Sequence, residues 1–163
     1  MTERVTIVAL GPADEAIAVR AMIEAMRMEV RLLHVTSPKD VSSELRRASE
    51  DDVVILSAQA SAKGFYLGGL GQASWVSAID AFQGVSFRNE AVLISTAGGA
   101  RESGLVDVMF HAGGHLIAPN GDPERQVIVP WIGACLLRAA SGLTEAVIGA
   151  NTLVDLENRF SYG

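Results

Sequence analysis

The chain has few of the residues that form cross-links, span membranes or bind nucleic acid. It holds a single cysteine among 163 residues, so no disulfide can form within it. No apolar run reaches the roughly 18 to 20 residues of a bilayer span, and the first residues lack a signal-peptide layout. Its 13 Lys and Arg are outnumbered by 19 Asp and Glu and form no dense basic run. We therefore expect a protein of the bacterial-type cytoplasm that binds neither membranes nor nucleic acid.

Several familiar site motifs are missing as well. The chain has no G-x-S-x-G nucleophile elbow, no H-E-x-x-H zinc motif and no G-x-x-x-x-G-K-[ST] phosphate loop. His34, His111 and His115 are not spaced as metal ligands, and His34 falls within an expected strand. Cys135 lies in an apolar stretch, where a small buried side chain is typical. We expect no metal and no cofactor.

The composition, by contrast, is that of a folded domain. Hydrophobic residues make up 49% of the chain and charged residues 20%, which is enough apolar material to offset the entropy lost on folding. A chain of this length is close to the common size of one domain and can bury one core without staples. We therefore expect a single domain over residues 1–163.

Short apolar runs alternate with segments of helical periodicity along the chain. The expected strands span residues 5–10, 30–35, 53–57, 91–96 and 115–118. The expected helices span residues 13–28, 40–49, 74–82, 105–112, 127–140 and 143–158. The Gly-rich residues 58–71 are expected to form a loop or hairpin. This order predicts an α/β fold: a central, mainly parallel sheet of five or six strands with helices on both faces, a three-layer sandwich of caspase-like or flavodoxin-like type.

Glycines gather where three of these strands end. Gly11-Pro12 follows the first strand, Gly68-Gly69 lies in the segment after the third, and Gly98-Gly99 follows the fourth. Open α/β sheets bind ligands at the carboxyl ends of their strands, so this edge is the expected site. One hypothesis is therefore a small-molecule or nucleotide-binding enzyme on a flavodoxin-like or Rossmann-like sheet.

Two strand ends also carry motifs that resemble a known family. The third strand reads L-S-A-Q-A over residues 56–60 and continues as K-G-F-Y-L, and the fourth reads I-S-T-A-G-G over residues 94–99. A later segment reads A-G-G-H-L-I-A-P-N-G-D-P and precedes a long apolar helix. Over roughly residues 50–158 this order is similar to that of the caspase-like cysteine protease superfamily, in particular its bacterial CHAT type. The family's strands end in patterns like L-S-x-H-G and L-S-x-C.

The resemblance implies that both catalytic positions are replaced. Gln59 stands where the family has its general-base histidine, and Ala97 stands where it has the nucleophilic cysteine. An amide and a methyl group can neither activate nor supply a thiolate. The resemblance therefore implies a non-catalytic pseudoenzyme that binds a protein or peptide partner, with an active relative as one candidate. Its expected binding residues are Ser57, Gln59, Gly64, Phe65, Tyr66, Ser95, Thr96, Gly98 and Gly99.

Two questions stay open at this point. Apolar residues near the expected site, such as Leu67, Leu70 and Trp75, either line a binding surface or pack against the helix that follows. The apolar helix expected over residues 127–140 either packs on the sheet or forms the interface of a homo-oligomer.

Overall fold

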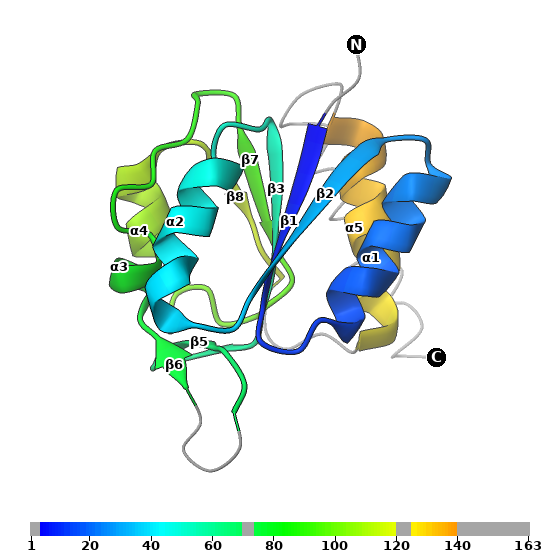
Figure 1. Ribbon diagram of the computed structural model, residues 1–163. Helices are drawn as coiled ribbons and strands as arrows, with labels where there is room; N and C mark the ends of the chain where they lie inside the picture. The colour runs from blue at the N-terminus through cyan, green and yellow to red at the C-terminus, as the bar shows by residue number, and fades with distance from the viewer. Residues whose placement is uncertain (1–3, 70–73, 120–124, 140–163) are drawn as a thin grey trace, which may run out of the picture.

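The computed structural model describes residues 4–69, 74–119 and 125–139. Five parallel strands form its central sheet, in the order β2 (Glu29–Val35), β1 (Arg4–Leu10), β3 (Val53–Ser57), β7 (Val92–Ser95) and β8 (His115–Ile117) (Figure 1). Numbered along this sheet alone, the order is 2-1-3-4-5, which is the doubly wound order of flavodoxin-like folds. The predicted fold class is therefore confirmed.

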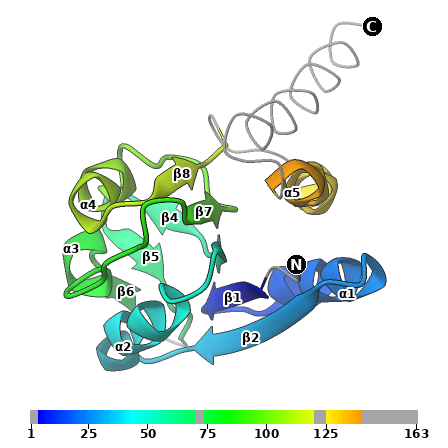
Figure 2. The ribbon, with the colours of Figure 1, turned by 90° about the horizontal axis from the view of Figure 1, so that it is seen from above.

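Helices cover both faces of the sheet. The helices α1 (Asp14–Ala25) and α5 (Arg125–Ala139) lie on one face. The helices α2 (Pro38–Ala48), α3 (Ala78–Ala81) and α4 (Leu105–Ala112) lie on the other (Figure 2). None of the helices among the described residues is both long enough and apolar enough to cross a bilayer.

The apolar strands explain why both faces are covered. Successive side chains of a strand point to opposite faces, so a strand buried on both sides is apolar throughout. In β3, Ile55 packs in the core beneath α1 and α5, whereas Leu56 packs in the core beneath α2, α3 and α4. All five side chains of β3 are buried, as expected for the central strand. The apolar side chains of the sheet thus pack against helices on both of its faces.

The sequence predicts most element boundaries closely. The strand over residues 53–57 and the helix over residues 105–112 have the predicted bounds. The other predicted strands differ from the observed ones by one residue at one end or at both. The first helix ends at Ala25, three residues before its predicted end. The helix expected over residues 143–158 lies outside the described residues.

The segment after β3 differs from the prediction in one respect. Residues 58–69 contain the hairpin strands β4 (Ala60–Ser61) and β5 (Gly64–Tyr66), which agrees with the expected loop or hairpin. The helix predicted over residues 74–82 is wrong at its beginning, because Trp75–Val76 form a strand, β6, that pairs with β5. Only Ala78–Ala81 are helical, after Ser77 caps the helix by accepting a hydrogen bond from the Asp80 amide. Pairing with β5 overrides the local helical pattern.

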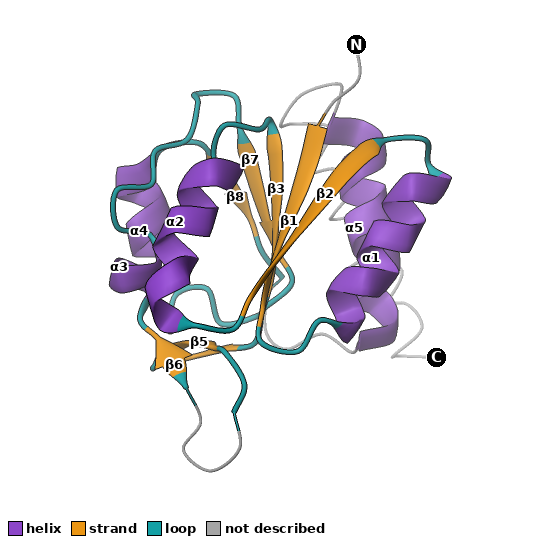
Figure 3. Cartoon of the chain, viewed as in Figure 1, coloured by secondary structure: helices purple, strands orange, loops and turns teal. Residues whose placement is uncertain are grey.

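This small antiparallel sheet lies at the carboxyl end of the main sheet (Figure 3). It touches the loop between β1 and α1 at Gly11, whose φ of +75° is a left-handed conformation that favours glycine. A Cβ atom at this position would lie 2.9 Å from the carbonyl oxygen of Tyr66. Gly11 therefore permits the close approach of the first loop to β5.

Candidate functional site

A cavity of about 640 Å³ opens at the carboxyl ends of β1, β3 and β7. The strands that follow β1 in the chain lie on its two sides, β2 on one and β3 on the other, so the chain reverses direction across the sheet here. Such a switch point leaves a crevice between neighbouring loops and is the usual ligand site of doubly wound sheets. The cavity is lined by Leu10, Pro12, Asp14, Glu15, Ser57, Ala58, Gln59, Ala60, Trp75, Thr96, Ala97, Gly98, Gly99 and Ile128. Its size suits a small ligand or one or two side chains of a peptide.

The floor of the cavity is built where β3 and β7 end. The Thr96 amide donates to the Leu56 carbonyl at 3.0 Å, which extends the ladder by one residue beyond the paired strands. The Thr96 hydroxyl then accepts from the Ala58 amide at 3.3 Å. In the turn after β7, the Ala97 amide donates to the hydroxyl of Ser95 at 3.2 Å. These hydrogen bonds fix the backbone of the cavity-lining residues that follow β3 and β7.

Glu15 brings negative charge into the cavity. It lies in the first turn of α1, half-buried, and accepts a hydrogen bond from the Ser57 hydroxyl at 3.0 Å. Ser57 is 2% exposed, so its hydroxyl is held in place and orients the carboxylate. Asp14 lines the same cavity from an exposed position beside Glu15. Among the described lining residues none is Lys, Arg or His, so the lining carries two acids and no base.

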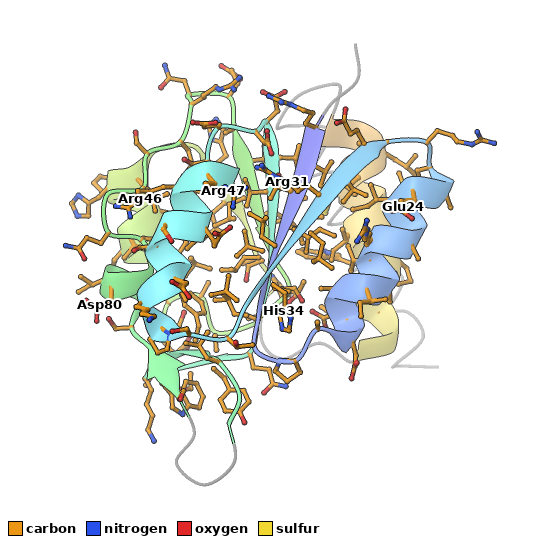
Figure 4. The ribbon with its side chains drawn as sticks, in the orientation of Figure 1. Glu24, Arg31, His34, Arg46, Arg47 and Asp80 are labelled. Atoms are coloured by element: carbon orange, nitrogen blue, oxygen red, sulfur yellow. The ribbon has the colours of Figure 1, made fainter. Side chains whose placement is uncertain are left out.

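The β1–α1 loop, which leads into these acids, is tied to the end of β2. The Gly11 amide donates to the Val35 carbonyl at 3.2 Å. The Nε2 atom of His34 lies 2.6 Å from the Gly11 carbonyl oxygen and donates to it. Figure 4 shows His34 toward the carboxyl end of β2, whereas Arg31 lies toward the opposite end of the same strand. The β1–α1 loop is therefore held at both polar groups of Gly11, which fixes where α1 begins.

The predicted binding residues divide into two groups. Those that line the cavity are Ser57, Gln59, Thr96, Gly98 and Gly99. The others, Gly64, Phe65, Tyr66 and Ser95, do not line it. Phe65 is fully buried with its ring centroid 6.4 Å from that of Phe82, just beyond α3.

The open question about the nearby apolar residues has a mixed answer. Leu67 is buried in the core, whereas Trp75 lines the cavity. Leu70 lies outside the described residues.

The predicted helix over residues 127–140 packs on the sheet through Ile128, Ile132 and Leu136, which are buried.

Asp14 and Glu15 fall at the start of the helix that the sequence predicts over residues 13–28, and they were not among the predicted binding residues. Their role in the cavity was missed, because the contact between Glu15 and Ser57 joins residues 42 positions apart. A usable signal was present nonetheless: two acids directly follow a glycine turn at the carboxyl end of a buried strand. At that place a ligand-binding loop is expected in an open α/β sheet.

Gln59 and Ala97 line the same cavity, from the ends of the adjacent parallel strands β3 and β7. The Gln59 side chain is exposed, and that of Ala97 is 7% exposed. The single cysteine lies elsewhere: Cys135 is fully buried in α5, and burial raises the pKa of its thiol to about 12. A thiol with so high a pKa is protonated at neutral pH, so Cys135 does not supply a thiolate nucleophile.

No protein-family model matches the chain, and no curated protein matches its sequence. Solved structures with a similar arrangement include flavodoxin 1 from Bacillus cereus, at 13% identity and a TM-score of 0.44, covering 90% of this chain and 97% of that one. A flavodoxin-like domain from Synechococcus sp. is 14% identical, with a TM-score of 0.42 and coverage of 95% and 99%. A structure described as flavone reductase is 14% identical, with a TM-score of 0.45 and coverage of 94% and 64%. At these identities and TM-scores the likeness carries no information about function.

In flavodoxin, which has this strand order, the flavin FMN binds at the β1/β3 switch point, so the fit of FMN can be tested on this chain's residues. A phosphate binds a helix N-terminus because backbone amides and the helix dipole attract negative charge. At the start of α1 that place is bordered by Asp14 and Glu15, which repel an anion. The residues at the start of α1 therefore do not fit a phosphate-bearing cofactor.

Proposed function

We propose that this protein is a ligand-binding domain that holds a small, phosphate-free ligand in the cavity at the carboxyl ends of β1, β3 and β7. The ligand donates hydrogen bonds to Glu15 and Asp14, and it is neutral or positively charged. One observation carries the proposal: the Glu15 carboxylate, oriented by Ser57, faces a cavity whose described lining contains no base.

The chemistry of the lining supports this choice of ligand. Besides the two carboxylates, Gln59 offers an amide, and Thr96 a hydroxyl that already bonds the backbone of Ala58. Acceptors thus outnumber free donors, so a ligand rich in hydroxyl or amino groups is complementary to the cavity. A hydrogen bond to a charged group contributes about 1.5 to 3 kcal/mol, which makes Glu15 the principal anchor.

A thermal-shift panel tests the proposal. Polyols and small amines are compared with phosphate, AMP and FMN at equal ionic strength. We expect stabilisation by one or more members of the first group and none of the second, since a ligand at a hundred times its Kd raises stability by about 2.7 kcal/mol. Stabilisation by FMN or AMP, or no response to any polyol or amine, contradicts it.

Variants then locate the binding. Glu15→Gln keeps the shape of the side chain but removes its charge, and we expect about tenfold to hundredfold weaker binding of the panel's best ligand. Ser57→Ala leaves the carboxylate but frees it to move, so we expect about twofold to tenfold weaker binding. Glu24→Gln is the matched control, because Glu24 is exposed near the other end of α1 and is paired with Arg20 (Figure 4). Equal losses in Glu15→Gln and Glu24→Gln contradict a site at Glu15.

A second candidate function is the binding of a peptide by a caspase-like pseudoenzyme. The observation that favours it is the presence of Gln59 and Ala97 in one cavity, at the ends of adjacent strands. In this proposal the cavity is the remnant of a protease cleft, and the amide and methyl group stand in place of base and nucleophile.

Restoring the two groups tests this second candidate. In Ala97→Cys alone, the introduced thiol lacks a base, and the nearby acids disfavour its thiolate. In the double variant Gln59→His with Ala97→Cys, an imidazole close to the thiol lowers the thiol's pKa. We expect the pH profile of alkylation by iodoacetamide to move to lower pH in the double variant. Identical profiles for the single and double variants contradict a shared catalytic geometry.

A further inference from the structure

An aromatic ring forms part of the cavity wall. Trp75 belongs to β6 and is half-buried, and it is held in place by pairing of β6 with β5. The ring of Tyr66 packs against it, with centroids 5.3 Å apart and an angle of 53° between the ring planes. The cavity therefore combines a fixed indole ring with the two carboxylates at the start of α1.

The ring already attracts one positive charge. The Nζ atom of Lys63, in the turn between β4 and β5, lies 5.9 Å from the centre of the Trp75 ring. This is within the distance at which an indole face attracts a cation, and tryptophan is the strongest aromatic partner for cations. Lys63 is not among the residues that line the cavity.

We propose that the ligand of this cavity is an organic cation, held between the indole ring of Trp75 and the carboxylate of Glu15, and that Lys63 weakens its binding. The inference rests on the proposed function and narrows its ligand class from donor-bearing compounds to positively charged ones. An ammonium or guanidinium group suits both residues, because the indole ring of Trp75 attracts a cation through its π electrons and the carboxylate of Glu15 attracts it through its full negative charge.

The effect of Lys63 has the same sign whichever face of the ring the ligand uses. If the ligand takes the face that Lys63 covers, the lysine must first be displaced. If it takes the opposite face, the two positive charges repel each other across the ring. Removing the charge of Lys63 therefore strengthens the binding of a cation. It strengthens the binding of a neutral compound less, because the repulsion acts on cations alone.

A pair of probes separates charge from shape. Choline and neohexyl alcohol have the same outline and one hydroxyl each, but neohexyl alcohol has carbon in place of the charged nitrogen. We expect choline to bind about fivefold to thirtyfold more tightly by calorimetric titration, as a cation over a partly desolvated ring gains about 1 to 2 kcal/mol. Methylguanidine serves as a second, planar cation.

Variants assign the preference to the named residues. Choline affinity should fall in the order Trp75, Trp75→Phe, Trp75→Leu, with roughly fivefold or greater loss at leucine. Lys63→Gln should strengthen choline binding about twofold to fivefold, and it should strengthen the binding of neohexyl alcohol less. Arg46→Gln is its control, since it removes one exposed positive charge from the last turn of α2. Circular dichroism and the unfolding midpoint show whether each Trp75 variant is folded, and Lys63→Gln tests the inference independently of them.

The outcomes distinguish this inference from the proposed function. Equal binding of choline and neohexyl alcohol overturns the cation preference, and it leaves the proposed function standing if Glu15→Gln weakens both. No binding of choline or methylguanidine also overturns it, whereas a response to the polyols of the thermal-shift panel still supports the proposed function. Unchanged choline affinity in both Trp75→Leu and Lys63→Gln contradicts the binding of the cation against the Trp75 ring.

Discussion

The contact between the first loop and β5 makes a sharp prediction for Gly11→Ala. Gly11 has a φ of +75°, and an L-residue in this left-handed conformation costs about 1 to 2 kcal/mol. Alanine also restricts the unfolded chain, which offsets about 0.4 to 1 kcal/mol of that cost. The backbone conformation alone therefore predicts a loss of about 1 kcal/mol in the free energy of unfolding.

A steric cost adds to the conformational one. The new Cβ atom would lie 2.9 Å from the Tyr66 carbonyl oxygen and 3.2 Å from the carbonyl carbon of Leu67. Both are backbone atoms, so no side chain can rotate away, and either the loop or β5 must move. Overpacking of this kind costs about 1 to 3 kcal/mol. We expect a total loss of about 2 to 4 kcal/mol for Gly11→Ala.

Gly68→Ala is the matched control. Gly68 has a φ of +83°, but the nearest atom to its added Cβ is the Gly11 Cα at 3.9 Å, an ordinary contact. It should therefore lose only the conformational part, about 1 kcal/mol. Urea unfolding followed by circular dichroism measures both variants, with unchanged m-values as the sign that the same unfolding is compared. If Gly11→Ala costs no more than Gly68→Ala, the close approach of loop and β5 is refuted.

Two further predictions concern buried groups away from the cavity. Asp51 is 6% exposed, accepts a hydrogen bond from the fully buried Thr6 hydroxyl and pairs with Arg31 at 3.3 Å. Because Arg31 is 44% exposed and regains water, Asp51→Ala should lower the free energy of unfolding by about 2 to 3 kcal/mol in urea, and a loss below about 0.5 kcal/mol contradicts the network. Burial raises the pKa of Cys135 from 9.0 to about 12, so its thiol should react with Ellman's reagent at pH 8 only after unfolding. Because the thiol ionises more readily in the unfolded chain, the free energy of unfolding should fall as the pH rises from about 9 to 12. Rapid reaction of the native protein contradicts the burial.

The local sequence pattern was enough to predict those helices and strands whose ends coincide with a change in hydrophobicity or with a glycine. The strand Val53–Ser57 begins with four consecutive apolar residues, and such a run is typical of a strand buried on both faces. The helix Leu105–Ala112 lies between Gly104 and Gly113, both with positive φ, which set its two ends. At these elements the local preference and the tertiary environment agree, so the sequence is sufficient.

Where tertiary pairing competed with local pattern, the sequence misled. Residues 74–82 have helical spacing, yet Trp75–Val76 extend and pair with β5. The partners lie in a different segment, and a local window contains no information about them. The same pairing places Trp75 in the wall of the cavity.

The sequence by itself determined the alternation of strands and helices, the burial of the sheet on both faces, and the edge at which a site was expected. These follow from hydrophobic periodicity and from the glycines after the strands, which act over a few residues. Only the tertiary structure decided the order of the strands, and with it the meeting of Glu15 and Ser57, 42 residues apart, in one cavity. Strand order is chosen by how the helices pack on the two faces of the sheet as a whole, and that energy belongs to no single segment of the chain.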